Sequence, residues 1–223
     1  MRFTCICWKS AGDRTRLTID AVGLGKFSAD HNFEFKHQQE GINILKSNGW
    51  LPGDDLVLLN PAGAFETRNW PLNHYLSFAR LWMQQFPETK FLVMGTGLIA
   101  TKASFLKNEL GDNLISIVNK TNPAQAFAII QRAKFILSED SGLMHMAWVS
   151  GIPTLALFGS TKSYMAKPLG NHTSFLDSSD LECGHCMLEI CKYGDTHCLT
   201  RYTPELVFKK AMTLLQSIQS SSK

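Results

Sequence analysis

Residues 138–147, with the sequence SEDSGLMHMA, place a carboxylate and a Ser-Gly pair at the start of a predicted helix. Backbone N–H groups at such a start favour an anion, so Ser141 and Gly142 are expected to face a phosphate. Asp140 would repel that phosphate, but it can accept hydrogen bonds from neighbouring sugar hydroxyls. The alternative is that Asp140 or Ser141 only caps the helix. For His145, one turn further on, a buried and hydrogen-bonded histidine is favoured over a catalytic base.

A second segment with suitable chemistry is LFGST, residues 157–161. Gly159 would let the backbone approach a ligand closely, and Ser160 and Thr161 could donate hydrogen bonds to phosphate oxygens. Many junctions between a strand and a loop have this composition, so the segment predicts a phosphate-facing turn only together with the first one.

The third segment is the loop NPAGAFETRNWP, residues 60–71. It combines small residues with Thr67 and Arg68, just before a helix that begins after Trp70-Pro71. A guanidinium can donate two parallel hydrogen bonds to one phosphate, which makes Arg68 a candidate ligand for a diphosphate. The alternative for Arg68 is a solvated loop arginine.

A cysteine cluster with the spacing C-x2-C-x4-C-x6-C comprises Cys183, Cys186, Cys191 and Cys198. Four thiolates could enclose a structural zinc ion. The spacing lacks the paired knuckles of a strong zinc motif, so reduced or paired thiols are the alternative. Cys5 and Cys7 form a separate group near the start.

Alternating strands and helices are expected to position these segments. A strand that runs into a loop is predicted within each of 56–64 and 154–161, and further strands are predicted at 91–97, 115–118, 134–140 and 174–177. Helices are predicted at 39–47, 75–86, 100–110, 123–132, 141–150 and 203–219. This alternation indicates βαβ units, and therefore a Rossmann-like α/β fold with a parallel sheet covered by helices on both faces. The three candidate segments all follow strands, and ligands of such sheets bind beyond the carboxyl ends of the strands.

The composition narrows the class of protein further. The net charge is +3, with lysines and arginines scattered along the chain, so nucleic acid is not a predicted partner. No apolar run reaches the length that spans a bilayer, and the first residues do not have the pattern of a secretory signal. A cytoplasmic location is therefore expected.

Taken together, the segments resemble the C-terminal domain of the glycosyltransferase family 9 heptosyltransferases, over residues 56–215. Residues 139–161, EDSGLMHMAWVSGIPTLALFGST, are similar to the family block D-[ST]-G-x-x-H-x-A…P-x-x-A-x-[FY]-G-[PS]-[ST]. The loop ETRNWP resembles the family's Lys-x-Trp-Pro element, with Arg68 in place of the lysine. The cysteine-rich tail, followed by a Thr-Pro-Glu helix, is also similar.

The resemblance implies the C-terminal half of a GT-B architecture, in which two Rossmann-like domains face each other across a cleft. It implies an inverting transfer of heptose from an ADP-sugar to the lipopolysaccharide core, with no cofactor required. Asp140 would bond the donor sugar and Arg68 its phosphates. The phosphate-facing turns would contain Ser141, Gly142, Gly159, Ser160 and Thr161.

The expected domain organisation follows from this resemblance. Residues 1–50 would be the remnant of an N-terminal domain plus a linker, since they are too few for a second Rossmann domain. Within them, AGDRTRL at 11–17 would match the end of that domain. Residues 51–223 would form the nucleotide-sugar-binding domain, with the cysteine-rich segment 183–198 and the helix 203–219.

The catalytic residues stay unassigned, because the family's proposed base belongs to the N-terminal domain. The lipopolysaccharide acceptor would need that complementary domain, with peripheral contact to the inner membrane. Two alternatives stay open: a non-catalytic or truncated nucleotide-sugar-binding module, and a UDP-sugar epimerase-type GT-B enzyme. The second would be favoured by binding of UDP-sugars and not of ADP-sugars. Residues 95–104 contain no acid, where many members hold the ribose with a glutamate, so the nucleotide specificity stays open.

Overall fold

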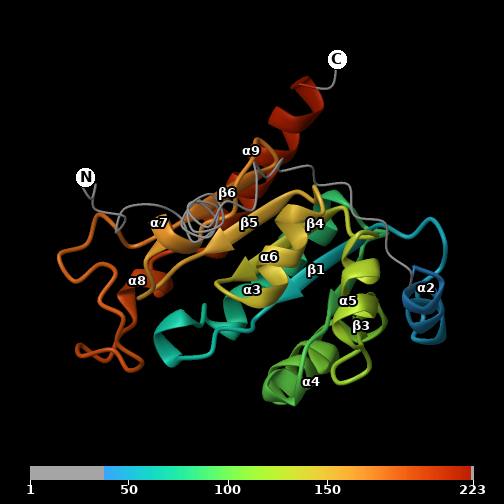
Figure 1. Cartoon of the computed structure of the whole chain (residues 1–223), viewed down its shortest axis with the longest axis horizontal. Coiled ribbons are helices and arrows are strands. Elements are labelled where there is room, and N and C mark those ends of the chain that lie inside the picture. The colour runs from blue at the N-terminus through green and yellow to red at the C-terminus, as the bar shows by residue number, and fades with distance from the viewer. Residues whose placement is uncertain (1–37, 222–223) are drawn as a thin grey trace, which may run out of the picture.

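The computed structural model describes residues 38–221, and these contain one six-stranded parallel sheet (Figure 1). Its strands are β1 (Leu56–Asn60), β2 (Lys90–Val93), β3 (Leu114–Ser116), β4 (Phe135–Glu139), β5 (Thr154–Leu157) and β6 (Thr173–Leu176). The order across the sheet is β3-β2-β1-β4-β5-β6, so successive strands are added first on one side of β1 and then on the other. In a doubly wound sheet of this order, the natural ligand site lies at the carboxyl ends of β1 and β4, where the direction of winding changes.

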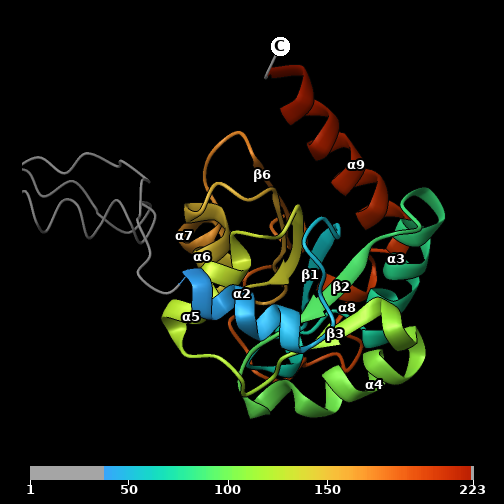
Figure 2. The same cartoon turned by 90° about the vertical axis from the view of Figure 1, so that its right-hand side faces the viewer.

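Helices cover both faces of the sheet (Figure 2). One face carries α3 (Leu72–Gln85), α4 (Ala100–Leu110) and α9 (Pro204–Ser221), and the other carries α2 (Gln38–Ser47), α5 (Pro123–Ile130) and α6 (Gly142–Val149). Shorter elements are η2 (Glu66–Arg68), η3 (Gly97–Ile99), η4 (Gly111–Asn113), α7 (Ser163–Ala166) and α8 (His197–Thr200). Within β1, Val57 and Leu59 face the first layer of helices, whereas Leu56 and Leu58 face the second. This alternation follows from the two-residue period of a strand.

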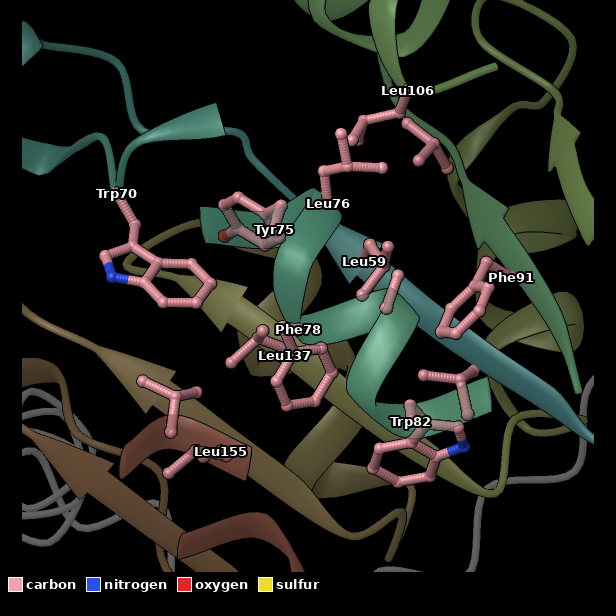
Figure 3. Close-up of a cluster of buried hydrophobic side chains, with 14 of the residues drawn as sticks. Leu59, Trp70, Tyr75, Leu76, Phe78, Trp82, Phe91, Leu106, Leu137 and Leu155 are labelled. Atoms are coloured by element: carbon pink, nitrogen blue, oxygen red, sulfur yellow. The ribbon is translucent and has the colours of Figure 1, made fainter. Parts of the chain in front are cut away.

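An aromatic cluster fills the core between α3 and the sheet (Figure 3). The rings of Trp82 and Phe135 stack with centroids 5.0 Å apart. Phe78, also on α3, belongs to the same cluster. Trp70, which precedes α3, is 2% exposed, and its indole N–H donates to the carbonyl of Tyr202 at 2.8 Å. The buried indole therefore anchors the loop before α3 to the segment before α9.

The C-terminal helix α9 packs back on the domain, as its apolar spacing predicted. Val207, Ala211 and Leu214 are buried in the core that α3 also lines. Thr203 caps the helix, because its hydroxyl accepts from the N–H of Leu206 at 3.3 Å. In the part of the chain that the structure describes, none of the helices combines the length and apolarity needed to cross a membrane.

The fold class and the predicted elements after residue 38 are confirmed, with shifted ends. The strand predicted within 56–64 ends at Asn60, and its loop begins at Pro61, which has no N–H for the ladder. The expected boundary at residue 50 does not separate α2 from the domain, since Leu45 and Trp50 are buried in the same cluster as β1 and α5. The predictions for residues 1–37, including Cys5, Cys7 and AGDRTRL, lie outside the described residues.

Candidate functional site

Arg68 and Asp140 meet at the carboxyl ends of β1 and β4. Asp140 directly follows β4, Arg68 ends η2, and the Arg68 Nη2 to Asp140 Oδ2 distance is 3.0 Å. The guanidinium also donates to the main-chain carbonyl of Asp140. The two side chains are only 18% and 11% exposed, so Arg68 is held in the site and is not a solvated loop arginine. The arginine Nε has no hydrogen-bond partner within residues 38–221.

The start of α6 lies beside this ion pair. Ser141 caps the helix, since its hydroxyl accepts from the N–H of Met144 at 3.4 Å. The same hydroxyl accepts from the amide of the buried Asn60 at 2.6 Å, so the capping alternative applies to Ser141. Gly142, the first residue of the helix, is exposed, and a Cβ there would meet none of the described atoms within 4 Å. The helix N-terminus is therefore open for a ligand to approach at Gly142.

His145 is hydrogen-bonded, as expected, but it is only partly buried. Its Nδ1 accepts from the indole N–H of Trp148 at 3.2 Å. Burial lowers the pKa of His145, and the nearby carboxylate of Asp140 opposes that shift. The side chain is therefore a neutral imidazole at pH 7 that supports the helix from one side.

Thr67 and Ser160 are placed differently from the expectation. Their hydroxyl oxygens lie 2.8 Å apart, and both residues are 1% exposed. Ser160 N–H donates to the Thr67 carbonyl at 3.1 Å, and the Thr67 hydroxyl donates to the carbonyl of Leu188 at 2.5 Å. Both hydroxyls are thus consumed inside the protein. The hydrogen bonds of these two residues join three loops.

Gly159 and Thr161 flank Ser160 and have distinct surroundings. A Cβ on Gly159 would collide with the carbonyl oxygen of Thr67, so the glycine is required by the packing of two loops. The Thr161 hydroxyl is buried and has no hydrogen-bond partner among the described residues. An unsatisfied buried hydroxyl is costly, which makes Thr161 the member of this turn that is ready for a ligand.

Glu139 is a residue of the site to which the sequence analysis assigned no role. It is fully buried at the end of β4 and accepts from the N–H groups of Gly63 at 2.5 Å and Trp70 at 2.7 Å. Burial raises its pKa to about 7, against the opposing effects of Lys102 and the two N–H donors. The available signal was an acid at the end of the strand FILSE, which begins with three apolar residues.

A cavity of about 480 Å³ adjoins Gly142, beyond the carboxyl ends of β2 and β3. Its apolar walls include Met94, Ile99, Leu143 and Met146, and its polar groups include Asn119 and Asn122. None of the described side chains that line it is acidic. A slot with apolar walls and a few amide groups suits a flat heterocyclic base. The sequence analysis had drawn attention here only to the missing acid of residues 95–104.

The structural zinc site considered as one possibility at the four cysteines is not formed among the described residues. Among residues 38–221, no group of three or more His, Cys, Asp or Glu side chains could hold a metal ion. The thiols are free and have different surroundings: Cys186 is exposed, Cys198 packs against the core, and Cys191 lies 3.7 Å from Asp195 Oδ1. Burial raises the pKa of Cys198 to about 11, so it is a thiol at neutral pH. Main-chain atoms of the cysteine-rich segment 183–198 form hydrogen bonds with Thr67 and Ser160.

The sheet order, the open helix N-terminus and the adjoining cavity define a Rossmann-like domain with a ligand site at the carboxyl edge of its sheet. The chain belongs to glycosyltransferase family 9 (heptosyltransferase), whose profile matches residues 15–197. It is 28% identical over 196 residues to lipooligosaccharide heptosyltransferase 2 of Campylobacter jejuni serotype O:2, covering 84% of this chain and 58% of that protein. The chain thus spans just over half the length of this relative.

Solved structures show the same fold. A glycosyltransferase family 9 protein of Veillonella parvula superposes with a TM-score of 0.79 at 21% identity, covering 93% of this chain and 60% of that one. The Escherichia coli heptosyltransferase WaaC with ADP-2-deoxy-2-fluoro heptose superposes with a TM-score of 0.61 at 18% identity, covering 90% and 55%. The domain is therefore the Rossmann-like half of a GT-B glycosyltransferase fold.

Proposed function

We propose that this chain is the donor-binding domain of a heptosyltransferase-type glycosyltransferase, and that it holds an ADP-activated heptose at the carboxyl edge of the sheet. The observation that carries the proposal is the contact of Arg68 with Asp140 beside the open start of α6. A cation, free N–H groups and a carboxylate side by side match a ligand that joins a diphosphate to a sugar. Family membership supports the same assignment.

The three parts of the donor have separate places in this proposal. The base enters the cavity between Met94 and Met146, next to Gly142. The diphosphate lies against the N–H groups at the start of α6, within reach of Arg68 and Thr161. The sugar hydroxyls donate hydrogen bonds to Asp140, whose carboxylate is held in place by Arg68. Thr67 and Ser160, being buried, support the site and do not contact the donor.

The chemistry is activation of the leaving group. As the acceptor hydroxyl oxygen bonds to the anomeric carbon, the bond from that carbon to the diphosphate breaks and negative charge builds on the departing ADP. Arg68 and the helix N–H groups stabilise that charge. Asp140 orients the sugar for attack from the opposite side. The hydroxyl proton passes to a base outside the residues described here.

The acceptor in this proposal is the lipopolysaccharide core, presented by a complementary acceptor domain at the inner face of the inner membrane. The names of curated relatives, such as the Campylobacter jejuni lipooligosaccharide heptosyltransferase, support this acceptor class. A complementary N-terminal domain can be added to test this. Transfer of the sugar to the acceptor would then distinguish a donor domain from a module that only binds nucleotide sugars.

A calorimetric screen of ADP-heptose, ADP and the GDP- and UDP-sugars tests the proposal. The wild-type chain should prefer ADP-heptose. Asp140→Ala should weaken ADP-heptose more than ADP, because both ligands lose the support that Asp140 gives to Arg68, whereas ADP-heptose also loses its sugar contact. Asp112→Ala, an exposed aspartate in η4 before β3, is the matched control and should bind as the wild type does. The absence of binding to any nucleotide sugar would reject the proposal, and a preference for UDP-sugars would favour the epimerase-type alternative.

A further inference from the structure

The loop between β1 and α3 is fastened at both of its ends by one carboxylate. Glu139 Oε2 accepts from Gly63 N–H at 2.5 Å, and Oε1 accepts from Trp70 N–H at 2.7 Å. Thr67 and Arg68 lie between these two anchor points. Each oxygen of the carboxylate thus has its own backbone donor, and the chain between the donors is closed into a loop of fixed span.

Lys102 of α4 holds the same loop through its carbonyl and amide groups. Its Nζ donates to the carbonyl of Pro61 at 2.9 Å and to Oδ1 of Asn69. These contacts fall next to the two N–H groups that Glu139 binds. Lys102 is also the nearby positive charge that most opposes the burial effect on Glu139. A cation and an anion from two different elements therefore fasten the same pair of loop ends.

We infer that Glu139 and Lys102 are positioning residues, which fix the loop from residue 61 to residue 70 so that Arg68 meets the donor diphosphate in a preformed site. The inference rests on the proposed function for its ligand, but not for the loop geometry. The buried carboxylate of Glu139 is weak as a source of stability, because removing the ion from water costs about as much as its hydrogen bonds and the nearby Lys102 return. These contacts instead favour ligand binding. They hold the loop in its binding conformation, so less conformational freedom is lost when the ligand binds.

Two variants and one control test the loop in the ligand-free protein. Glu139→Gln keeps the shape of the side chain, but its NH₂ group cannot accept a hydrogen bond, so one of the two backbone N–H groups loses its acceptor. Lys102→Met keeps an unbranched side chain and removes the positive charge. The matched control is Glu66→Gln, because Glu66 is an exposed glutamate of the same loop. Amide hydrogen exchange at Gly63 and Trp70 should accelerate about tenfold or more in Glu139→Gln and not in the control. Equal exchange in Glu139→Gln and Glu66→Gln would overturn the inference, whatever the chain binds.

The binding consequence is measured with ADP. Its affinity should fall about tenfold in Glu139→Gln and in Lys102→Met, and it should be unchanged in Glu66→Gln. Unchanged affinity in both loop variants would overturn the positioning role. If the wild type itself binds no nucleotide, the proposed function fails, while the exchange experiment still decides the loop anchoring.

A pH profile separates positioning from a purely structural role. The groups facing Glu139 are Tyr75 from α3 and Lys102 from α4, with the Arg68–Asp140 pair alongside. Because the phosphates of ADP titrate in the same range, the informative quantity is the ratio of wild-type to Glu139→Gln affinity. That ratio should rise between pH 6 and 8 as Glu139 ionises around pH 7. A flat ratio would contradict the inference. If Glu139→Gln does not fold, exchange at Gly63 and Trp70 is measured in the wild type and corrected for intrinsic exchange. For loop openings that leave Glu139 buried, protection should rise over the same range, because the ionised carboxylate is the stronger acceptor, and unchanged protection would overturn the inference.

Discussion

At the scale of single residues, the site is arranged around a cation that already has a partner. Arg68 is paired with Asp140 at 3.0 Å, and one of its guanidinium nitrogens, Nε, lacks a hydrogen bond within the described part of the chain. The contacts of the guanidinium with Asp140 both use Nη2, so a diphosphate can bind another N–H group of the arginine without displacing the aspartate. The aspartate in turn stays oriented for a sugar.

Substitution of Arg68 should affect ligands according to their phosphates. Arg68→Ala should weaken ADP about tenfold to a hundredfold, the usual worth of hydrogen bonds to a charged group, and should leave adenosine affinity unchanged. Arg68→Lys should lie between, because a lysine keeps the charge without the planar fork. Calorimetric titration of ADP and adenosine measures both effects. Equal loss of ADP and adenosine affinity would show that Arg68 acts on the fold of the site and not on phosphate.

At the scale of elements, two glycines in adjacent turns have opposite reasons for being small. Gly159, after β5, is packed against the carbonyl of Thr67, whereas Gly142, at the start of α6, faces open space. Glycine is required at position 159 by the packing of the protein, whereas Gly142 leaves space that a ligand can enter. Sequence pattern alone predicts both as phosphate-facing, because it cannot show which neighbour approaches each glycine.

The two alanine variants should therefore separate stability from binding. Gly159→Ala should lower the free energy of unfolding by about 1–3 kcal/mol, the range for overpacking. Gly142→Ala should leave that free energy within about 0.5 kcal/mol, but weaken ADP, since its methyl group would stand before the helix N-terminus. Urea denaturation and ADP titration of both variants provide the measurement. Destabilisation of similar size in both variants would refute this distinction.

At the scale of the whole molecule, the doubly wound sheet gathers loops from distant parts of the chain at one edge, and a buried acid lies beneath them. Glu139 in the folded protein has a pKa of about 7, compared with 4.5 as its reference value. Between these values the folded protein binds more protons than the unfolded chain does. The contribution of Glu139 to stability must therefore decrease as pH rises from 4.5 to 7.

This pH dependence can be measured by comparing the free energy of unfolding of the wild type with that of Glu139→Gln. The free energy of unfolding of the wild type, minus that of Glu139→Gln, should fall as pH rises from 4.5 to 7 and stay level above that range. Subtraction removes most of the effect of other titrating groups, such as His145. Urea unfolding at several pH values measures it. A difference that is constant with pH would show that Glu139 does not have a raised pKa in the fold.

Much of the fold was predictable from sequence, because period and turn chemistry are local. The apolar runs at β1, β2 and β4, and the Thr203-Pro204 start of α9, each identify an element without knowledge of the others. Element ends were less accurate, as at β2, which ends at Val93 and not at residue 97, and the packing of α2 was not predicted. Its burial depends on contact with α5, about 80 residues later in the chain, which no local pattern shows.

The location of the candidate site was predictable from sequence. Which of its residues face a ligand and which hold the loops together was not. The rule that ligands bind at the carboxyl ends of strands correctly brought Arg68 and Asp140 together. The pairing of Thr67 with Ser160 arises only when two loops meet in space, and so does the anchoring of Gly63 by Glu139. Such contacts depend on tertiary proximity, which residue type and spacing do not reveal.

The most direct measurement of the central claim is a titration of the chain with ADP, followed by backbone amide chemical shifts. Binding at the carboxyl edge should shift Gly142 and Thr161, together with the cavity residues Gly95 and Asn119. Residues at the opposite edge, such as Asp55, should not move. Shifts confined to that opposite edge, or no shifts at saturating ADP, would contradict the account.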